Sequence, residues 1–170
     1  MTTYIALLRA VNVGGTGKLP MTELKSMCEQ AGFQKVKTYI ASGNVVFQSE
    51  LSEAKVKSAL ETALEAYAGK PVGTMVRTAS EMAAVLAVNP FPDRPNNRTV
   101  AIFLDQPPPA DVLKSATGQN EEEIQLGKRE IYVHYAGGMA DSKLKIPCAK
   151  NGTARNINTV AKLAQMTAEL

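Results

Sequence analysis

The sequence predicts an α+β protein with two ferredoxin-like, βαββ-type halves, whose antiparallel or mixed sheets carry packed helices. Short apolar runs alternate with segments in which apolar residues recur every three or four positions. In the first half these segments follow the order strand, helix, strand, strand, helix, strand, which is the split βαβ arrangement. A proline-rich segment, 89–97, cannot form regular structure and separates two such series. The predicted parts are 1–88, the connection 89–97, and 98–170.

The first half opens with the apolar strand Tyr4–Leu8, whose continuous hydrophobicity is typical of a strand covered on both faces. Turn residues and helix caps mark the elements that follow. These are a helix with Met21, Leu24 and Met27 on one face that stops at Gly32, strands at 36–40 and 44–48, a helix capped by Ser52 that ends near Gly69, and a strand at 73–77.

A capping box, Thr78 with Glu81, predicts a short helix through Val88. Beyond the connection we expect a strand at 99–104, a short helix at 110–115, strands at 122–126 and 130–135, and a helix from about Arg155 to Ala168. The second half therefore reads βαββα, and no closing strand is predicted.

Composition excludes several classes of protein. No apolar run approaches the ~20 residues that span a bilayer, and the N-terminus lacks the features of a signal peptide, so we expect a cytoplasmic protein without a membrane partner. The net charge is +3, too small to indicate nucleic-acid binding by itself. Cys28 and Cys148 form no CxxC pair, and His134 is the one histidine, so neither a metal site nor a cofactor is predicted.

The loop that follows the first strand suggests an anion site. Gly14, Gly15 and Lys18 lie in it, but a Walker A loop would need glycine in place of Asn12 and a hydroxyl residue in place of Leu19. What remains is a set of backbone N–H groups before a helix, with one lysine, which can hold an anion. The alternative is a strand-to-helix turn that needs positive φ.

Two further sets of residues lie beside this loop in the predicted topology. Arg9 ends the apolar strand, so it either pairs with a carboxylate such as Glu23 or faces a cleft. Ser42 and Asn44 lie in the turn between the second and third strands, which a ferredoxin-like sheet places at the same end as the first loop. They serve either as turn residues or as partners of the same ligand.

The C-terminal segment carries five cations and no carboxylate between residues 142 and 168. On the predicted helix Arg155, Thr159 and Lys162 form a polar stripe, headed by Thr153 as N-cap, which is suited to a phosphate or a carboxylate. The alternative is a solvated face of an amphipathic helix.

Catalytic motifs give little support to an enzyme of known type. His134 shares a strand face with Glu130 and Tyr132, and no GxSxG motif is present, so a nucleophilic triad is not indicated. A lone strand histidine is typical of a surface or interface, and the acidic run 121–123 is typical of a solvated strand edge.

Four sequence blocks resemble one known family. They are IALLRAVNVGG at 5–15, KTYIASGNVVF at 37–47, NPF at 89–91 and TARNINTVAKL at 153–163. Together they resemble the bacterial family DUF1697, a domain of unknown function, over essentially the whole chain, although Ile157 stands where an aromatic residue is expected. The resemblance implies an α+β fold with ferredoxin-like halves, and it implies no activity.

Three functions from different classes follow as hypotheses. The first is a binding module for an anionic, phosphate-bearing ligand, either a small molecule such as a nucleotide or a nucleic acid. The second is an enzyme of unrecognised type acting on a phosphorylated or carboxylated metabolite, and the third is a self-association or interaction protein. The first two require that Lys18 and Arg155 meet around one ligand.

Overall fold

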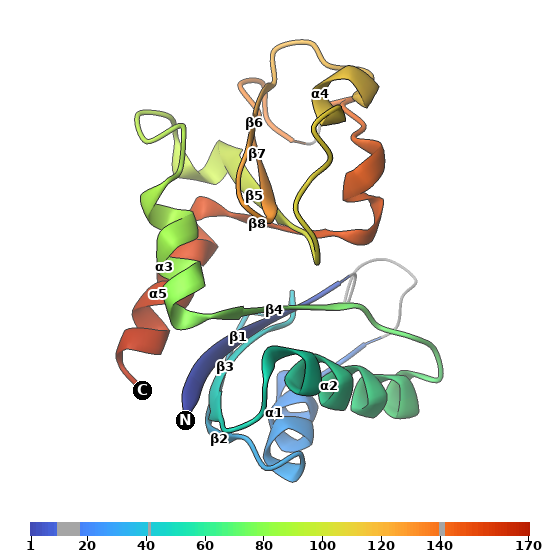
Figure 1. The fold of residues 1–170 in the computed structure, drawn as a ribbon, viewed down its shortest axis with the longest axis vertical. Coiled ribbons are helices and arrows are strands. Elements are labelled where there is room, and N and C mark those ends of the chain that lie inside the picture. Colours follow the sequence, from blue (N-terminus) through green and yellow to red (C-terminus); the bar gives the residue numbers. More distant parts are fainter. Residues whose placement is uncertain (10–17, 41, 140–141) are drawn as a thin grey trace. The chain divides into compact units, whose positions relative to one another are not determined.

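Two four-stranded antiparallel sheets form the frame of the chain in a computed structural model, which describes residues 1–9, 18–40, 42–139 and 142–170 (Figure 1). The elements of the first half and of its exit are β1 (Thr2–Leu8), α1 (Met21–Gln30), β2 (Gln34–Tyr39), β3 (Asn44–Ser49), α2 (Glu53–Ala68), β4 (Thr74–Thr78) and α3 (Ala79–Ala87). Those that follow are η1 (Asn96–Arg98), β5 (Thr99–Phe103), α4 (Val112–Ser115), β6 (Glu123–Leu126), β7 (Glu130–His134), η2 (Pro147–Asn151), β8 (Thr153–Asn156) and α5 (Ile157–Ala168).

The two sheets share one topology. The strand order is β2-β3-β1-β4 in the first sheet, here called sheet A, and β6-β7-β5-β8 in the second, here called sheet B. Counted from the first strand of each half, both orders read 2-3-1-4, and every pairing is antiparallel. The predicted pair of ferredoxin-like halves is confirmed. In the second half the helix equivalent to α2 is replaced by the short 3-10 helix η2.

The predicted βαββα order of the second half is wrong at its end. Residues Thr153–Asn156 form a closing strand, β8, which pairs with β5, and α5 begins only at Ile157. The cap of α5 is Asn156, whose Oδ1 accepts the backbone N–H of Thr159 at 2.9 Å. Asn is as good an N-cap as Thr, so local preference alone did not distinguish a cap at Thr153 from one three residues later.

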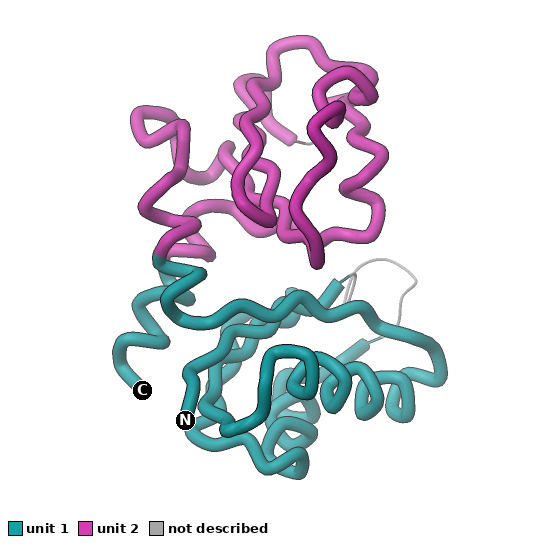
Figure 2. The backbone as a smooth tube through the Cα atoms, in the orientation of Figure 1, with its two compact units in different colours: residues 1–83, 162–170 teal, residues 84–161 magenta. Residues whose placement is uncertain are grey.

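The chain divides into two compact units. Unit 1 comprises residues 1–83 and 162–170, and unit 2 comprises residues 84–161 (Figure 2). Both divisions fall inside helices, the first in α3 and the second in α5. The separation of halves at segment 89–97 stays a prediction.

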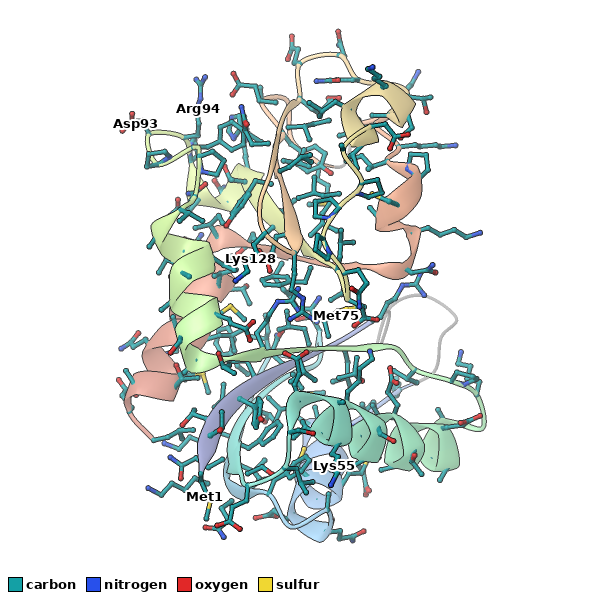
Figure 3. All side chains as sticks on the ribbon, viewed as in Figure 1. Met1, Lys55, Met75, Asp93, Arg94 and Lys128 are labelled. Atoms are coloured by element: carbon teal, nitrogen blue, oxygen red, sulfur yellow. The ribbon has the colours of Figure 1, made fainter. Side chains whose placement is uncertain are left out.

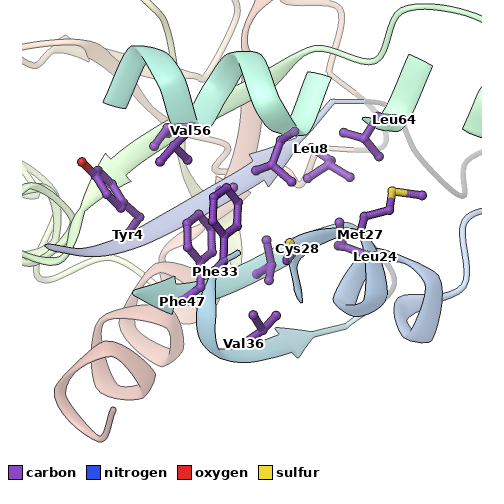
Figure 4. Close-up of a cluster of buried hydrophobic side chains, with 14 of the residues drawn as sticks. Tyr4, Leu8, Leu24, Met27, Cys28, Phe33, Val36, Phe47, Val56 and Leu64 are labelled. Atoms are coloured by element: carbon purple, nitrogen blue, oxygen red, sulfur yellow. The ribbon is translucent and has the colours of Figure 1, made fainter. Parts of the chain in front are cut away.

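The core of unit 1 lies between sheet A and the helices α1 and α2 (Figure 4). Alternate residues of β1 face the helices, as the period of two in a strand requires. Phe33 stacks on Phe47 with ring centroids 4.3 Å apart and planes inclined by 5°. Buried members of this cluster are Tyr4, Ala6, Leu8, Leu19, Leu24, Met27, Cys28, Phe33, Val36, Val45, Phe47, Val56, Leu60, Leu64 and Val76.

Local signals place the helices as the sequence predicts. Ser52 accepts the backbone N–H of Lys55 at 3.3 Å and caps α2, which ends at Gly69 with φ 74°. The capping box before α3 is present, because Thr78 Oγ1 accepts the N–H of Glu81 and the Glu81 carboxylate accepts the N–H of Thr78.

The core of unit 2 lies on one face of sheet B. Its buried members are Val100, Ile102, Leu104, Val112, Ile124, Ile131, Val133 and Ile146. The opposite face carries Tyr132, which is buried and whose hydroxyl donates to the carbonyl of Val85 at 2.7 Å. Within the part of the chain that the structure describes, no helix has both the length and the apolar character of a membrane span.

Candidate functional site

One end of sheet A brings together the segments that the sequence predicts to be neighbours. The N–H of Leu8 donates to the carbonyl of Gly43 in the β2–β3 turn at 2.8 Å. The next residue, Arg9, donates its N–H to the carbonyl of Gly73 before β4 at 2.9 Å. The end of β1, the β2–β3 turn and the start of β4 therefore meet, as the ferredoxin-like topology requires. We call this region the sheet A end.

The helix α1 begins at the same sheet A end. The helix ends at Gln30, four positions before Gln34, and Gln34 pairs with Gln48 at the opposite end of sheet A. Since α1 packs along β2, its first turn lies at the end where β1 stops. Among the residues that the structure describes, no side chain caps this first turn, which follows Pro20. Its leading N–H groups and the helix dipole therefore favour an anion.

Two cations lie beside the first turn of α1, one because it is close in the sequence and the other because it ends a strand of the sheet. Lys18 is exposed and precedes the N-cap Pro20 by two positions. Arg9 is exposed as well, and the aliphatic part of its side chain covers Gly73. A Cβ atom added to Gly73 would lie 3.7 Å from Cβ and Cδ of Arg9. Asn12, Gly14 and Gly15 of the predicted anion loop lie outside the described residues.

The β2–β3 turn uses its polar side chains for its own structure. Asn44 is fully buried, and its Nδ2 donates to the carbonyl of Tyr39 at 2.8 Å and to Oγ of Ser42 at 2.9 Å. These bonds fit the interpretation of Ser42 and Asn44 as turn residues. Ile40 has φ 50° and is 49% exposed, an unusual backbone conformation for an exposed β-branched residue.

The start of β4 carries an unsatisfied hydroxyl. Thr74 is fully buried, and its Oγ1 has no hydrogen-bond partner in the described part of the chain. Its backbone is held from α2, because Glu61 Oε2 accepts its N–H at 3.0 Å and Lys57 Nζ donates to its carbonyl. Lys57 and Glu61 also pair with each other at 3.2 Å.

The predicted cationic stripe on the last helix is wrong. Thr153 and Arg155 belong to the strand β8 and are buried, and Thr159 is buried in the first turn of α5. Lys162 is exposed, as predicted. The stripe fails because the strand turns Arg155 toward a covered sheet face, whereas a helix would have turned it toward solvent.

Arg155 is a buried cation on the second face of sheet B, opposite Ala101 in the register. Its guanidinium donates to Thr153 Oγ1 at 2.8 Å and to the carbonyl of Ala154 at 2.9 Å, both neutral acceptors. Burial lowers the pKa of Arg155 from its ordinary 12.5 to about 10. Lys18 lies in unit 1 and Arg155 in unit 2, and the site that would join them stays a prediction.

The same face of sheet B carries His134 and Glu130 with Tyr132, the grouping that alternation predicts. A surface or interface histidine was expected here, and the surface alternative is wrong because His134 is only 5% exposed. Its Nδ1 lies 3.0 Å from Oγ1 of Thr99, and its ring packs on Phe91 with centroids 6.0 Å apart. Burial, and then the charge of Glu130, raise the pKa of Tyr132.

A hollow of about 460 Å³ lies beside these residues and was not predicted from the sequence. It is lined by Pro90, Phe91, Pro92, Asp93, Arg94 and Glu123. Glu123 was expected on a solvated edge, and it lies on the edge strand β6 with 45% of its side chain exposed. Its Oε1 accepts from Arg94 at 3.0 Å, and its Oε2 is buried. The prolines predicted that the segment 89–97 is irregular, but the sequence did not show that β6 lies beside it, because the two are brought together only by the fold.

In the described ranges no group of three or more His, Cys, Asp or Glu side chains could hold a metal ion. Cys28 is buried in the unit 1 core, and burial raises the pKa of its thiol to about 12. A thiol of this kind stays protonated and has the character of a packing residue.

Comparison with known proteins supports the fold and adds no activity. A solved structure described as "conserved bacterial protein SP0830 from Streptococcus pneumoniae" is similar over 98% of both chains, with a TM-score of 0.81 and 28% sequence identity. No curated protein matches the sequence. A family model described as "Protein of unknown function (DUF1697)" matches residues 1–132.

Proposed function

We propose that this chain, which belongs to the DUF1697 family of proteins of unknown function, binds a small phosphate-bearing anion at the sheet A end. The observation that carries the proposal is the uncapped first turn of α1, flanked by the exposed cations Arg9 and Lys18. Each feature alone has an ordinary structural explanation. Their occurrence at one end of one sheet is what favours an anion.

The chemistry of these groups fits a phosphate. Backbone N–H groups at a helix start donate hydrogen bonds, and the helix dipole adds roughly half a positive charge there. A guanidinium such as that of Arg9 can donate two parallel hydrogen bonds to a phosphate, and Lys18 adds a mobile point charge. The strained Ile40 in the adjoining turn supports the proposal, because such conformations concentrate at functional sites.

The test is a calorimetric titration of the full chain with pyrophosphate, with Arg9→Gln and Lys18→Gln as variants. Lys55→Gln is the matched control, because Lys55 is an exposed lysine in the first turn of α2, at the other end of sheet A. We expect the dissociation constant to rise about tenfold for each of the first two variants, since a charged hydrogen bond contributes about 1.5–3 kcal/mol. The control should bind as the wild type does.

Equal binding by all four proteins, or no binding by the wild type, would refute the site. Arg155→Gln in the same titration tests the prediction that Arg155 contributes to the same ligand. Replacing pyrophosphate by a short oligonucleotide tests the nucleic-acid alternative, for which log affinity must fall linearly with log salt concentration. If the site binds a small molecule instead, the protein should bind pyrophosphate tightly. Its affinity for an oligonucleotide should then not rise with the length of the oligonucleotide.

A further inference from the structure

The hollow in unit 2 has the size and walls of a small-molecule site. Its volume of about 460 Å³ falls in the range of roughly 300–1,000 Å³ that is typical of ligand pockets. Three of its lining residues, Pro90, Phe91 and Pro92, offer apolar rings from one loop. The polar lining residues are Asp93, Arg94 and Glu123, and Figure 3 shows Asp93 and Arg94 projecting from this loop.

The loop is held in shape by its own hydrogen bonds. Asn89 Oδ1 accepts the N–H of Phe91 at 3.0 Å, and the carbonyl of Phe91 accepts the N–H of Arg94 at 3.1 Å. The Phe91 ring rests on the ring of His134, whose Nδ1 is within hydrogen-bonding distance of Thr99. The apolar wall is therefore formed before any ligand arrives, which lowers the entropic cost of binding.

The charges of the hollow favour a cation. Two carboxylates, those of Asp93 and Glu123, line the hollow together with one guanidinium, that of Arg94, so the formal sum of their charges is −1. Arg94 already donates to Glu123 Oε1 at 3.0 Å. Within the described part of the chain Asp93 has no ion-pair partner, and its carboxylate stays available at the rim.

One oxygen of the Glu123 carboxylate lacks a hydrogen bond. Its Oε2 is buried and accepts from no donor among the described residues, although an ionised carboxylate has about four acceptor positions. An unsatisfied buried acceptor destabilises the state that contains it. Glu123 lines the hollow and 45% of its side chain is exposed, so an N–H group of a ligand in the hollow can donate to this carboxylate.

We propose that this hollow binds a small organic cation, a primary ammonium group carried on an apolar body. The ammonium group donates to Glu123 and lies near the carboxylate of Asp93, and the apolar body covers Phe91 and the two prolines. A positive group beside an aromatic face gains a cation–π attraction as well. This site takes the opposite charge from the sheet A end and is independent of it.

The experiment is an amide chemical-shift titration of the full chain with benzylammonium at pH 7, with benzyl alcohol as the uncharged probe of the same shape. We expect benzylammonium to shift the amides of residues 91–94 and 123 in a saturable way, and benzyl alcohol to bind at least tenfold more weakly. Glu123→Gln keeps the size of the side chain and should weaken benzylammonium at least tenfold. Asp93→Asn should weaken it less, because that carboxylate is exposed.

Glu121→Gln is the matched control, since Glu121 is an exposed carboxylate two positions from Glu123, and it should bind as the wild type does. The proposal is wrong if no amide shift occurs around the hollow up to about 10 mM benzylammonium, a concentration about tenfold above a weak dissociation constant of about 1 mM. It is equally wrong if benzyl alcohol binds as well, or if Glu123→Gln binds unchanged with a wild-type spectrum elsewhere. Pyrophosphate binding by Glu123→Gln should be unaltered, which separates this test from that of the anion site.

Discussion

Replacing Arg155 by methionine should leave the stability of the protein nearly unchanged at neutral pH, although it removes hydrogen bonds. The guanidinium lies on a buried sheet face, with 8% of the residue exposed, and the acceptors of its hydrogen bonds include two neutral oxygens, Oγ1 of Thr153 and the carbonyl of Ala154. Burial disfavours its charged form and lowers the pKa to about 10. Methionine keeps the length and flexibility of the side chain without the charge.

The magnitude follows from the pKa. A fall from 12.5 to about 10 at about 1.36 kcal/mol per unit makes the folded state about 3 kcal/mol less favourable at pH 7 than it would be with an unshifted group. Losing the hydrogen bonds to Thr153 and Ala154 costs about 1.5 kcal/mol or more each, because the donor is charged. The two contributions therefore nearly cancel, and the free energy of unfolding at pH 7 should change by less than about 1 kcal/mol.

The pH dependence of this contribution to stability is opposite to that of a base whose charged form has a favourable partner in the folded state. Because the folded pKa is depressed, the penalty is fully present below about pH 10 and is relieved as the pH rises from there toward 12.5. The stability of Arg155→Met relative to the wild type should accordingly fall by about 1 kcal/mol between pH 7 and pH 11.

Urea unfolding of the wild type and of Arg155→Met at pH 7 and pH 11 measures both quantities. Lys145→Met, a change at an exposed lysine, is the control and should alter stability by less than about 0.5 kcal/mol. If Arg155→Met instead lowers the free energy of unfolding by more than about 1 kcal/mol at pH 7, the reasoning is refuted, because the charge would then be compensated within the fold.

Two further predictions concern the unit 1 core. Cys28, with a pKa raised to about 12 by burial, should resist alkylation at pH 8 in the folded protein, while the less buried Cys148 reacts; mass spectrometry should find one modified thiol before unfolding and two after it. Modification of both thiols in the native state would contradict the burial of Cys28. Phe47→Ala should lower the free energy of unfolding by about 3–5 kcal/mol, because Phe47 is fully buried and stacks on Phe33. A loss under 1 kcal/mol by urea unfolding would show that this stack is not part of the stable core.

The parts of the fold that local chemistry determines were predictable from the sequence. The Ser52 cap, the stop at Gly69 and the Thr78–Glu81 capping box each form within a few residues of chain, and each is found where it was expected. The strand order followed from the sequence of elements, because few topologies satisfy the rules of connection.

The parts that depend on distant pairing were not predictable. Thr153–Asn156 is too short for its period of two to be distinguished from a helix start, and pairing with β5 makes it a strand. Arg155 is buried for the same reason. Arg77 is likewise buried in β4 opposite Ile5, and no motif marks it. Glu123 and Phe91 are 32 positions apart, and only the fold places both at one hollow.

Unit 1 is completed by the last residues of the chain, and this has a consequence for synthesis on the ribosome. Residues 162–170 belong with residues 1–83, and among them Leu163 and Met166 are buried. Unit 2 is continuous and can close while translation is still under way. The N-terminal sheet is made first, but Leu163 and Met166 join its unit only once residues 162–170 have been synthesised. A nascent chain, or a product cleaved before residue 162, therefore exposes apolar surface on the part of the molecule that was synthesised earliest.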